Sequence, residues 1–339
     1  MTLPALGVVI VSFNSSDVIL DCLGTLLAAP GVRLHVVVVD NASTDGTPAL
    51  IRDWASGRVP HRVADDLPFE ARPLPRPVAM EGPEAPLHLI EAGVNGGYGA
   101  GVNIGLSYLS GIDGLDRFWI LNPDAVVPPA TPRAFATHDE GKPFALMGGR
   151  VTYYEPADMI QMDGGTLDRR TGVTGNLNLG ASFATTPPPD PSRIDFISGA
   201  NMVVSRAHYE TAGPMAEDYF LYYEEIDWSM RRGALPLAFC PTARIHHRAG
   251  TAIGSPTLAR IASPFSIYFL HRARMRFMRR FHPEALPTAW AYSLAKAAQL
   301  LARGYPAQAR ALIAGARDAA LPRAVRDRLG PEASRRAAR

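Results

Sequence analysis

Short apolar runs separated by helical patterns occupy the first third of the chain. Two continuous runs of branched apolar residues, Leu6–Phe13 and Leu34–Asp40, are typical of strands covered on both faces of a parallel sheet. His88–Gly93 and Phe118–Asn122 predict two further strands. Because helical patterns separate the strands, we expect an α/β fold with a mostly parallel, Rossmann-like sheet and right-handed crossovers.

Helical periodicity predicts the connecting elements. The first helix is expected over Ser16–Ala28, with Ser16 and Asp17 as capping residues. Ser43–Ala55 begins a second helix, and Gly99–Ser110 makes a loop and a third helix. Residues 58–86 hold seven prolines, which predicts a long surface excursion without regular structure.

The pattern changes in the second half of the chain. From about Met147 the strands become shorter and are separated by Gly/Asp turns, and helices follow Ser263. We therefore expect a first half over 1–146, an α+β half over 147–263 and a C-terminal helical region over 264–339.

Charge divides the chain unevenly, although the net charge is only +2. Residues 264–339 hold 15 Lys and Arg against 4 Asp and Glu, a net charge of +11, so the remainder carries −9. A basic tail on an acidic body predicts an anionic partner: a membrane surface, a nucleic acid or a lipid phosphate.

Composition excludes several classes of protein. Cys22 and Cys240 form neither a disulfide framework nor a metal-knuckle spacing. The N-terminus reads as a first strand and not as a signal peptide. No window reaches the roughly 18 apolar residues of a spanning helix. A cytoplasmic protein, soluble or peripheral on a membrane, is expected.

Three of the four predicted strands end on polar residues. They are Ser12 and Asn14, Asp40 and Asn41, and Asn122 and Asp124. Any one could be a helix cap, but ligands of open parallel sheets sit beyond the carboxyl ends of the strands. Asp40 could accept from a base imide or a ribose hydroxyl. Asp124 could hold Mg²⁺ or Mn²⁺ against a diphosphate.

A glycine-rich stretch, Asn95–Gly105, follows the third predicted strand. Its spacing is G-x-G-x-x-x-G, and a dinucleotide fingerprint would follow the first strand instead. Asn95 and Asn103 suit hydrogen bonding to a nucleotide or a sugar.

Two later segments carry candidate chemistry. Glu224 and Glu225 are expected at the start of a helix. They either only stabilise that helix end, or one of them has a raised pKa and acts as a general base. Asp227 and Arg231, at i and i+4, are expected to form a surface pair. In Ala243–Ala252, two adjacent histidines stand at the end of a strand. They are either structural, or one binds a metal ion and the other supports that ligand.

The order of these motifs resembles glycosyltransferase family 2, and within it the rhamnosyltransferase-like branch. The resemblance runs from about residue 6 to 280, and its segments are V-I-V-S-F-N (Val9–Asn14), V-D-N-A-S-T-D-G-T (Val39–Thr47), N-G-G-Y-G-A-G-V-N-I-G (Asn95–Gly105), L-N-P-D (Leu121–Asp124), F-L-Y-Y-E-E-I-D (Phe220–Asp227) and a late His. It implies a GT-A fold, an inverting mechanism, a nucleotide-diphosphate sugar donor and a divalent cation, Mg²⁺ or Mn²⁺.

The resemblance also implies roles for individual residues. The nucleoside pocket and the donor site would be lined by Ser12, Asn14, Asp40, Asn95, Asn103 and Asn122. Asp124 would be a metal ligand, completed by His246 in preference to His247. Glu225 matches the family's base, with Glu224 as the alternative. On this basis 1–146 is the nucleotide-sugar half and 147–263 the acceptor half of a catalytic domain.

Three positions depart from the family pattern. Glu225 stands where the branch usually has Asp, Ala216 stands where the family tends to have Asp, and Arg272 is followed by Ala273 instead of Asn. These departures affect the assignment of the donor more than that of the reaction. The expected function is transfer of a sugar, with dTDP-rhamnose the favoured donor, to a cell-surface glycan or a lipid-linked acceptor.

The sequence is compatible with two rival functions. One is another nucleotide-binding α/β enzyme, a nucleotidyltransferase or a dinucleotide-dependent oxidoreductase, and the other is a non-catalytic sugar-nucleotide-binding relative. The basic region 264–339 combines Arg clusters with apolar residues at helical spacing. It is expected to pack on the catalytic domain or in a homodimer, or to rest on anionic lipid at the inner face of the plasma membrane. A nucleic-acid partner is not expected, because no reader motif is present.

Overall fold

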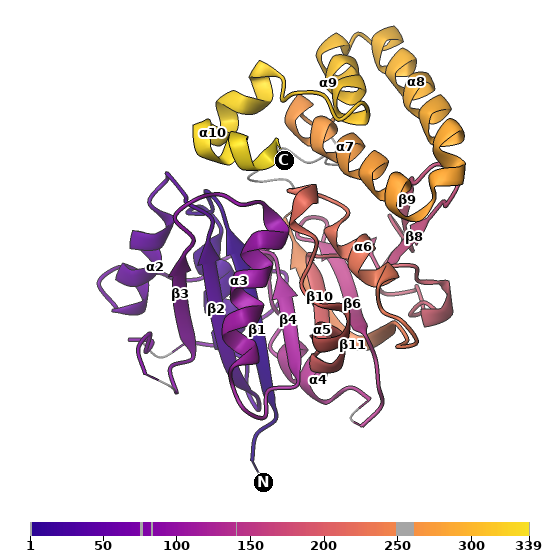
Figure 1. The fold of residues 1–339 in the computed structure, drawn as a ribbon. Coiled ribbons are helices and arrows are strands. Elements are labelled where there is room, and N and C mark those ends of the chain that lie inside the picture. Colours follow the sequence, from indigo (N-terminus) through magenta and orange to yellow (C-terminus); the bar gives the residue numbers. More distant parts are fainter. Residues whose placement is uncertain (1, 75–76, 83, 140, 249–260, 339) are drawn as a thin grey trace.

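One curled sheet runs through the molecule (Figure 1). The computed structural model describes residues 2–338 except 75–76, 83, 140 and 249–260. The strands of the main sheet are β1 (Ala5–Ser12), β2 (Arg33–Asp40), β3 (Leu87–Glu91), β4 (Arg117–Leu121), β5 (Ala125–Val126), β6 (Leu146–Tyr153), β7 (Ile160–Met162), β10 (Asn201–Ser205) and β11 (Ala238–His247). Their order is β3-β2-β1-β4-β10-β6-β11-β5, and β7 pairs with β6 beside this path. The hairpin β8 (Gly165–Leu167) and β9 (Thr174–Asn176) stands apart.

The four strands predicted in the first half of the chain are present and parallel. β1 pairs in parallel with β2 and with β4, and β2 pairs in parallel with β3. β10 runs antiparallel to β4 and β6, so the strands of the second half extend the same sheet. Within 58–86, the described residues form no helix or strand, as the seven prolines predict.

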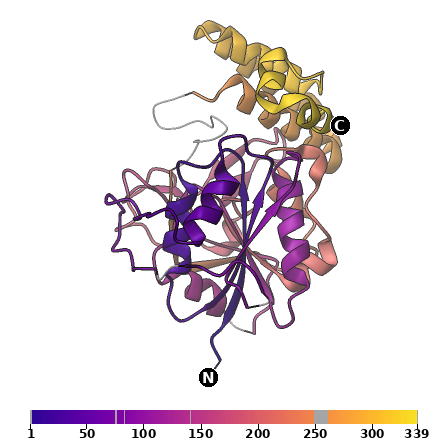
Figure 2. The same ribbon diagram turned by 90° about the vertical axis from the view of Figure 1, so that its left-hand side faces the viewer.

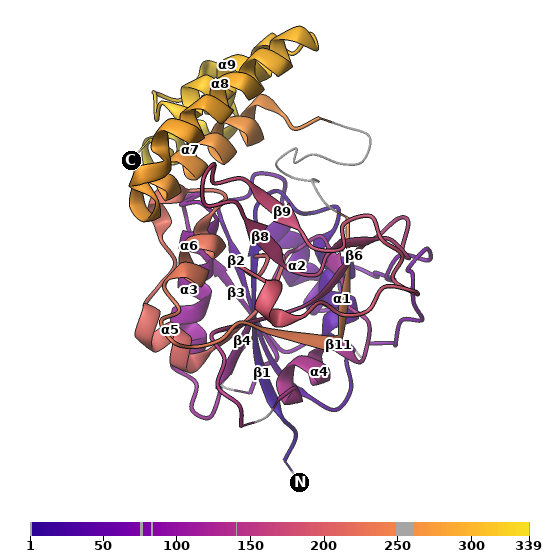
Figure 3. The ribbon, with the colours of Figure 1, turned by 90° about the vertical axis from the view of Figure 1, so that its right-hand side faces the viewer.

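Helices cover both faces of the sheet. These helices are α1 (Ile19–Leu27), α2 (Thr47–Ala55), α3 (Tyr98–Ser110), α4 (Thr131–Thr137), α5 (Arg206–Ala212) and α6 (Glu224–Met230). Four more helices form the C-terminal part of the chain: α7 (Pro264–Phe281), α8 (Leu286–Ala302), α9 (Pro306–Ala316) and α10 (Arg323–Ala337). Because strand side chains alternate, Val8 and Ile10 pack with α1 and α2, whereas Val9 packs with α3. Figure 3 shows α3, α5 and α6 on one side of the sheet and α1 and α4 on the other.

The start of α1 corrects one prediction. The helix begins at Ile19, and neither Ser16 nor Asp17 caps it, because its N-cap position is Val18 and makes no side-chain bond. A turn precedes it instead, in which the N–H groups of Val18 and Ile19 both donate to Ser15 O, at 3.1 and 3.0 Å. The N–H of Ser16 donates away from the helix to Asp45 Oδ2 at 2.9 Å.

The curl of the sheet places the second histidine of the β11 pair beside the end of β4. Only Asn122–Asp124 separates β4 from β5, yet β10, β6 and β11 lie between these two strands in the sheet. β5 pairs antiparallel with the end of β11, with His247 opposite Ala125. The sheet must therefore bend round until β11 meets the chain that leaves β4.

The C-terminal helices lie beyond the end of the sheet opposite the N-terminus (Figures 1 and 2). The N-terminus leads directly into β1, so this is the end at which the parallel strands finish. α7 contacts the short 3₁₀ turn Glu217–Tyr219 that precedes α6. Within the described part of the chain, none of the helices combines the length and the apolar character needed to cross a bilayer.

Candidate active site

Asp40 organises the loop that follows β2. Its side chain is buried, with Oδ1 accepting from Ser12 Oγ at 2.9 Å and from Ser43 Oγ at 2.6 Å. Oδ2 accepts from the Ser43 N–H at 2.9 Å. Asn14 joins the same loop, because its Oδ1 accepts from the Thr44 N–H at 2.8 Å. The structure thus brings Ser12, Asn14 and Asp40 together, as expected for one pocket, and adds Ser43, whose only sequence signal was its place in the turn after the strand.

The glycine-rich stretch connects this rim to the segment before α6. Asn41 Nδ2 donates to Gly97 O at 2.9 Å, and Asn95 Oδ1 accepts from the Gly97 N–H at 2.9 Å. Gly97 has φ +93°, and a Cβ there would lie 2.3 Å from Phe220 O. The next N–H, that of Tyr98, donates to Phe220 O at 2.8 Å. A glycine is therefore required where α3 meets the chain that leads to the two glutamates.

Asn103 serves this same junction. Its Nδ2 donates to Met215 O at 3.0 Å and to Glu217 Oε1 at 2.9 Å, and its Oδ1 accepts from the Met215 N–H at 2.9 Å. The amide therefore holds the loop before α6. A direct contact with a donor stays a prediction.

Tyr98 links the glycine-rich stretch to the end of β4. Its hydroxyl donates to Gly199 O at 2.7 Å, and the next carbonyl, that of Ala200, accepts from the Asn122 N–H at 3.2 Å. Hydrogen bonds therefore run from the rim at Asn41, through Gly97 and Tyr98, to the Asn122–Asp124 segment.

Asp124 lies against the imidazole of His247. The distance from Asp124 Oδ1 to His247 Nε2 is 3.0 Å, and Asn122 Nδ2 lies 3.2 Å from the same nitrogen. His247 Nδ1 donates to Gln161 Oε1 at 2.7 Å. Burial opposes the charged imidazole, but the adjacent Asp124 carboxylate outweighs this effect and raises the pKa of His247. When the ring is neutral, Nε2 offers its lone pair beside the carboxylate.

His246 points away from Asp124, which corrects the preference for it. Successive side chains of a strand face opposite sides, so the two histidines cannot share one partner. His246 Nδ1 lies 2.9 Å from Thr152 Oγ1, and its ring stacks on Phe69 at 5.7 Å between centroids. Burial lowers the pKa of His246 to about 4, so this ring is neutral and packed. The predicted segment continued to Ala252, and its residues from 249 lie outside those described.

Asp124 and His247 fit a divalent cation. A carboxylate and a neutral imidazole are both ligands that Mn²⁺ accepts, and these two groups lie side by side, with Asp124 Oδ1 3.0 Å from His247 Nε2. The Gln161 contact fixes the imidazole in the way that supporting groups fix metal-binding histidines. Among the residues described, no cluster of three or more His, Cys, Asp or Glu forms a complete metal site. A cation here would take its other ligands from phosphate oxygens and water.

Glu224 and Glu225 begin α6, as predicted. Glu224 is buried, and its two carboxylate oxygens have no hydrogen-bond partner among the described residues. Burial, reinforced by the neighbouring Glu225 charge, raises the pKa of Glu224 well above its usual value. Burial also raises the pKa of Glu225 to about 7. The carboxylates lie close enough to Tyr98 to add to the effect of burial in raising the pKa of its hydroxyl.

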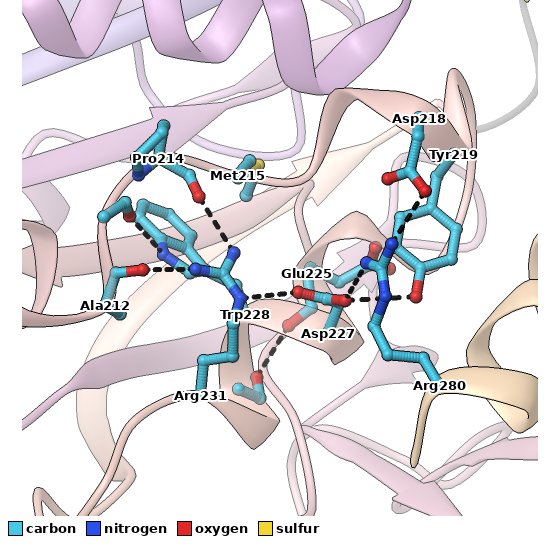
Figure 4. A network of polar contacts seen from close by, with 12 residues as sticks. Ala212, Pro214, Met215, Asp218, Tyr219, Glu225, Asp227, Trp228, Arg231 and Arg280 are labelled. Atoms are coloured by element: carbon cyan, nitrogen blue, oxygen red, sulfur yellow. Dashed lines mark hydrogen bonds and ion pairs between the residues drawn. The ribbon is translucent and has the colours of Figure 1, made fainter. Parts of the chain in front are cut away.

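Asp227 is buried, which corrects the expectation of a surface pair (Figure 4). Its Oδ1 accepts from Arg231 Nε at 2.6 Å, so the predicted pairing is present. Its Oδ2 accepts from Arg280 Nη1 of α7 at 2.6 Å and from the Tyr219 hydroxyl at 3.1 Å. Arg280 Nη2 also pairs with Asp218 Oδ2 at 2.7 Å. Sequence reasoning missed Arg280, because nothing in its own segment marks it among several arginines.

The loop that leads into α6 is strained and is held by α7. Phe220, Tyr222 and Tyr223 all have φ near +70°, a conformation unfavourable for residues with a side chain. The Phe220 ring stacks on Phe269 of α7 at 5.0 Å, and the Tyr223 ring packs on Phe277 at 5.6 Å. The C-terminal region therefore contacts the residues that fix the start of the helix with the candidate base.

Comparison with known proteins agrees with this architecture. The model of the family described as glycosyl transferase family 2 matches residues 7–65, which hold most of β1, all of β2 and the Asp40 loop. Two solved structures share the fold: the mannosyltransferase PcManGT from Pyrobaculum calidifontis in complex with GDP-Man and Mn²⁺, and GalNAc-T7 with UDP, GalNAc and Mn²⁺. The first is 18% identical, with a TM-score of 0.52 over 94% of this chain and 87% of that chain. The second is 12% identical, with a TM-score of 0.53 over 82% and 48%. The chain thus has the mixed α/β GT-A fold, with a curled central sheet flanked by helices.

A protein with a similar sequence is also a glycosyltransferase. The chain is 27% identical over 230 residues to the low-salt glycan biosynthesis hexosyltransferase Agl10 of Haloferax volcanii. The match covers 67% of this chain and 61% of the relative's length. Together with the family 2 match and the fold, this similarity supports a glycosyltransferase; the rhamnosyltransferase-like branch stays a prediction.

Proposed function

We propose that this chain is a glycosyltransferase that moves a hexose from a nucleotide-diphosphate donor to a hydroxyl of a glycan or lipid-linked acceptor. The observation that carries the proposal is the 3.0 Å contact between Asp124 and His247, which lies at the carboxyl edge of the parallel strands. A chain of hydrogen bonds connects it to the Asp40 loop. The hexosyltransferase relative and the family 2 match support the same reaction.

The donor would lie along this edge. Ser12, Asn14 and Asp40 would bind the nucleoside, and the Asn95–Tyr98 turn would border the donor. Asp124 and His247 would hold a divalent cation, with Mn²⁺ or Mg²⁺ as the candidates. Bound there, the cation would offset the negative charge that develops on the leaving diphosphate.

Glu225 would act as the base of an inverting transfer. A base with a pKa of about 7 is ionised in a useful fraction near neutral pH and is still strong enough to accept a proton. Its carboxylate would take the proton of the acceptor hydroxyl while that oxygen bonds to the anomeric carbon. The bond from the anomeric carbon to the diphosphate oxygen breaks at the same time, and its electron pair leaves with the diphosphate.

The identity of the donor sugar and nucleotide is a more specific part of the proposal. The branch resemblance favours dTDP-rhamnose, whereas PcManGT was solved with GDP-Man and GalNAc-T7 with UDP and GalNAc. The catalytic domain of the proposal spans 1–263, and its product would belong to a cell-surface glycan.

A donor screen tests the function directly. The full chain is heated with Mn²⁺ and each of dTDP-rhamnose, GDP-mannose, UDP-GlcNAc and UDP-GalNAc, and the melting temperature is recorded. A donor that binds only the folded chain raises the melting temperature, so one donor is expected to do so more than its free nucleotide. If no nucleotide sugar shifts the melting temperature, the proposal is wrong. If a donor binds but no acceptor mixture yields nucleoside diphosphate, the non-catalytic rival is favoured.

A further inference from the structure

Three large apolar side chains are exposed close together near the end of the chain. Leu294 and Leu301 of α8 are 59% and 55% exposed, and Tyr305, just beyond the helix, is 38% exposed. A spacing of seven places the two leucines on one stripe of the helix. The neighbouring face of α8 buries Ser293, Ala297 and Leu300. The exposed stripe is therefore additional to the one that the fold uses.

A shallow groove beside this stripe separates α8 from α9. Its volume is about 590 Å³, and its apolar lining comes from Ala297, Leu301, Ala309, Ile313 and Ala314. Arg310 and Arg317 also line it. Apolar walls and cationic side chains thus occur on the same surface.

The charge of this hairpin is of one sign. Leu286–Arg317 contains Lys296, Arg303, Arg310 and Arg317 and no Asp or Glu. In the part of the chain that the structure describes, none of these four cations forms an ion pair with an acid. Three arginines of α7 differ, because Arg272 and Arg276 pair with Asp318, and Arg280 pairs with Asp227. Arg303, Arg310 and Arg317 are all exposed, so they carry charge that no ion pair with a described residue neutralises.

We infer that this surface, made of Leu294, Leu301, Tyr305, Lys296, Arg303, Arg310 and Arg317 and called here the α8–α9 surface, docks on an anionic lipid bilayer. At a bilayer interface, exposed leucines can insert among the apolar acyl chains while unpaired cations bind the anionic head groups. α8 and α9 lie on the far side of α7 from the sheet, beyond the end at which the parallel strands finish (Figure 1). Docking would bring that end, with the candidate site, toward lipid-borne acceptors. This last point rests on the proposed function; the docking itself does not.

Two other occupants fit this surface less well. Two copies of the chain related by a two-fold axis would place the same cations against one another. Single-stranded nucleic acid is bound by several aromatic platforms, whereas Tyr305 is the one large aromatic exposed on this surface. Both occupants become outcomes of the test.

Vesicle flotation with the full chain tests the inference. The vesicles are phosphatidylcholine alone or phosphatidylcholine with phosphatidylglycerol, and no nucleotide is added. The wild type is expected to float only with the anionic vesicles and to be released by salt. Leu294→Ser with Leu301→Ser, and separately Arg303→Gln with Arg310→Gln and Arg317→Gln, are each expected to weaken the partition about tenfold or more.

Matched variants of the body control for surface changes in general. Leu179 is 55% exposed, like Leu301, so Leu179→Ser removes an equally exposed leucine elsewhere. Arg62→Gln with Arg72→Gln and Arg170→Gln removes the same amount of charge from exposed body positions. Both control variants are expected to float like the wild type, and circular dichroism checks that all variants are folded.

Four results would overturn the inference. They are flotation unchanged in both α8–α9 variants, equal flotation with neutral vesicles, a dimer that the same substitutions dissociate and that does not bind vesicles, and binding to single-stranded nucleic acid with no binding to vesicles. Transfer to a soluble acceptor is measured separately on the same variants. Loss of flotation with transfer intact supports the docking surface, whereas flotation without any transfer in the wild type removes the proposed function alone.

Discussion

Arg280 of α7 and Asp227 of α6 form an ion pair of 2.6 Å that joins the C-terminal helices to the helix with the candidate base. The carboxylate is fully buried, whereas 40% of the arginine side chain is exposed. Tyr219 and Arg231 complete the surroundings of Asp227 (Figure 4).

Arg280→Gln tests the strength of this connection. Asp227 would keep Arg231 but lose one of two cations, so we expect the free energy of unfolding to fall by about 2 kcal/mol, less than for a buried carboxylate left wholly unpaired. Denaturant unfolding measures the change. Arg169→Gln is the matched control, because Arg169 is 64% exposed and lies 3.9 Å from Asp195, and an exposed pair contributes less than about 1 kcal/mol. Equal effects of the two substitutions would contradict this account.

His247→Gln should weaken Mn²⁺ binding where His246→Gln does not. The first variant removes a nitrogen 3.0 Å from Asp124, and the second removes a ring packed between Thr152 and Phe69. We expect the Mn²⁺ concentration that half-saturates the thermal shift to rise about tenfold or more in His247→Gln. His246→Gln should lower the melting temperature without changing that concentration. The reverse pattern would return the ligand role to His246.

Glu225→Gln should stop transfer while leaving donor binding intact. Loss of a general base typically lowers kcat by about 10²–10⁴. The wild-type rate should rise with pH through about 7, because burial raises the pKa of Glu225 to about 7 and only the ionised form accepts a proton. A pH–rate profile checks this, with Glu210→Gln, an exposed glutamate of α5, as the control. Near-normal turnover in Glu225→Gln would move the base to Glu224.

Gly97→Ala should be far more damaging than Gly93→Ala. Both glycines have positive φ, +93° and +71°, so both substitutions carry the backbone penalty of about 1 kcal/mol. Only at Gly97 would the new Cβ meet a backbone atom, Phe220 O, at 2.3 Å, whereas at Gly93 nothing lies within 4 Å. We expect Gly97→Ala to cost about 2 kcal/mol more and to reduce kcat, because the loop before Glu224 must move. Thermal unfolding and initial rates measure both effects.

The first half of the fold could be predicted from the sequence because its signals are local. The runs Leu6–Phe13 and Leu34–Asp40 are mostly apolar, as strands buried on both faces must be, and the polar residues Ser12 and Asp40 at their ends mark the rim directly. The predicted helix cap at Ser16 is wrong, because the N–H groups at the start of α1 donate to Ser15 O and the N–H of Ser16 donates to Asp45. Composition alone does not separate these two uses of a short polar side chain.

The types of residue in the candidate site could be predicted from the sequence, but the contacts between them could not. Strand alternation separates His246 from His247, but which of them meets Asp124 depends on the antiparallel register of β11 with β5. The burial of Asp227 depends on Arg280, which lies in a different helix far along the chain. Both are long-range relationships without any local pattern, so one sequence could not reveal them.

The pairing of β5 with β11 also sets an order of events during synthesis. β4 can join β1 as soon as it emerges, but β5 waits for a partner that includes His247. The chain that leaves β4 at Asp124 therefore remains without its final neighbours until most of the polypeptide has been made, and α7, which steadies the glutamate-bearing helix, comes later still. A nascent chain halted before that point would display a finished nucleotide-side sheet and an unassembled reaction centre.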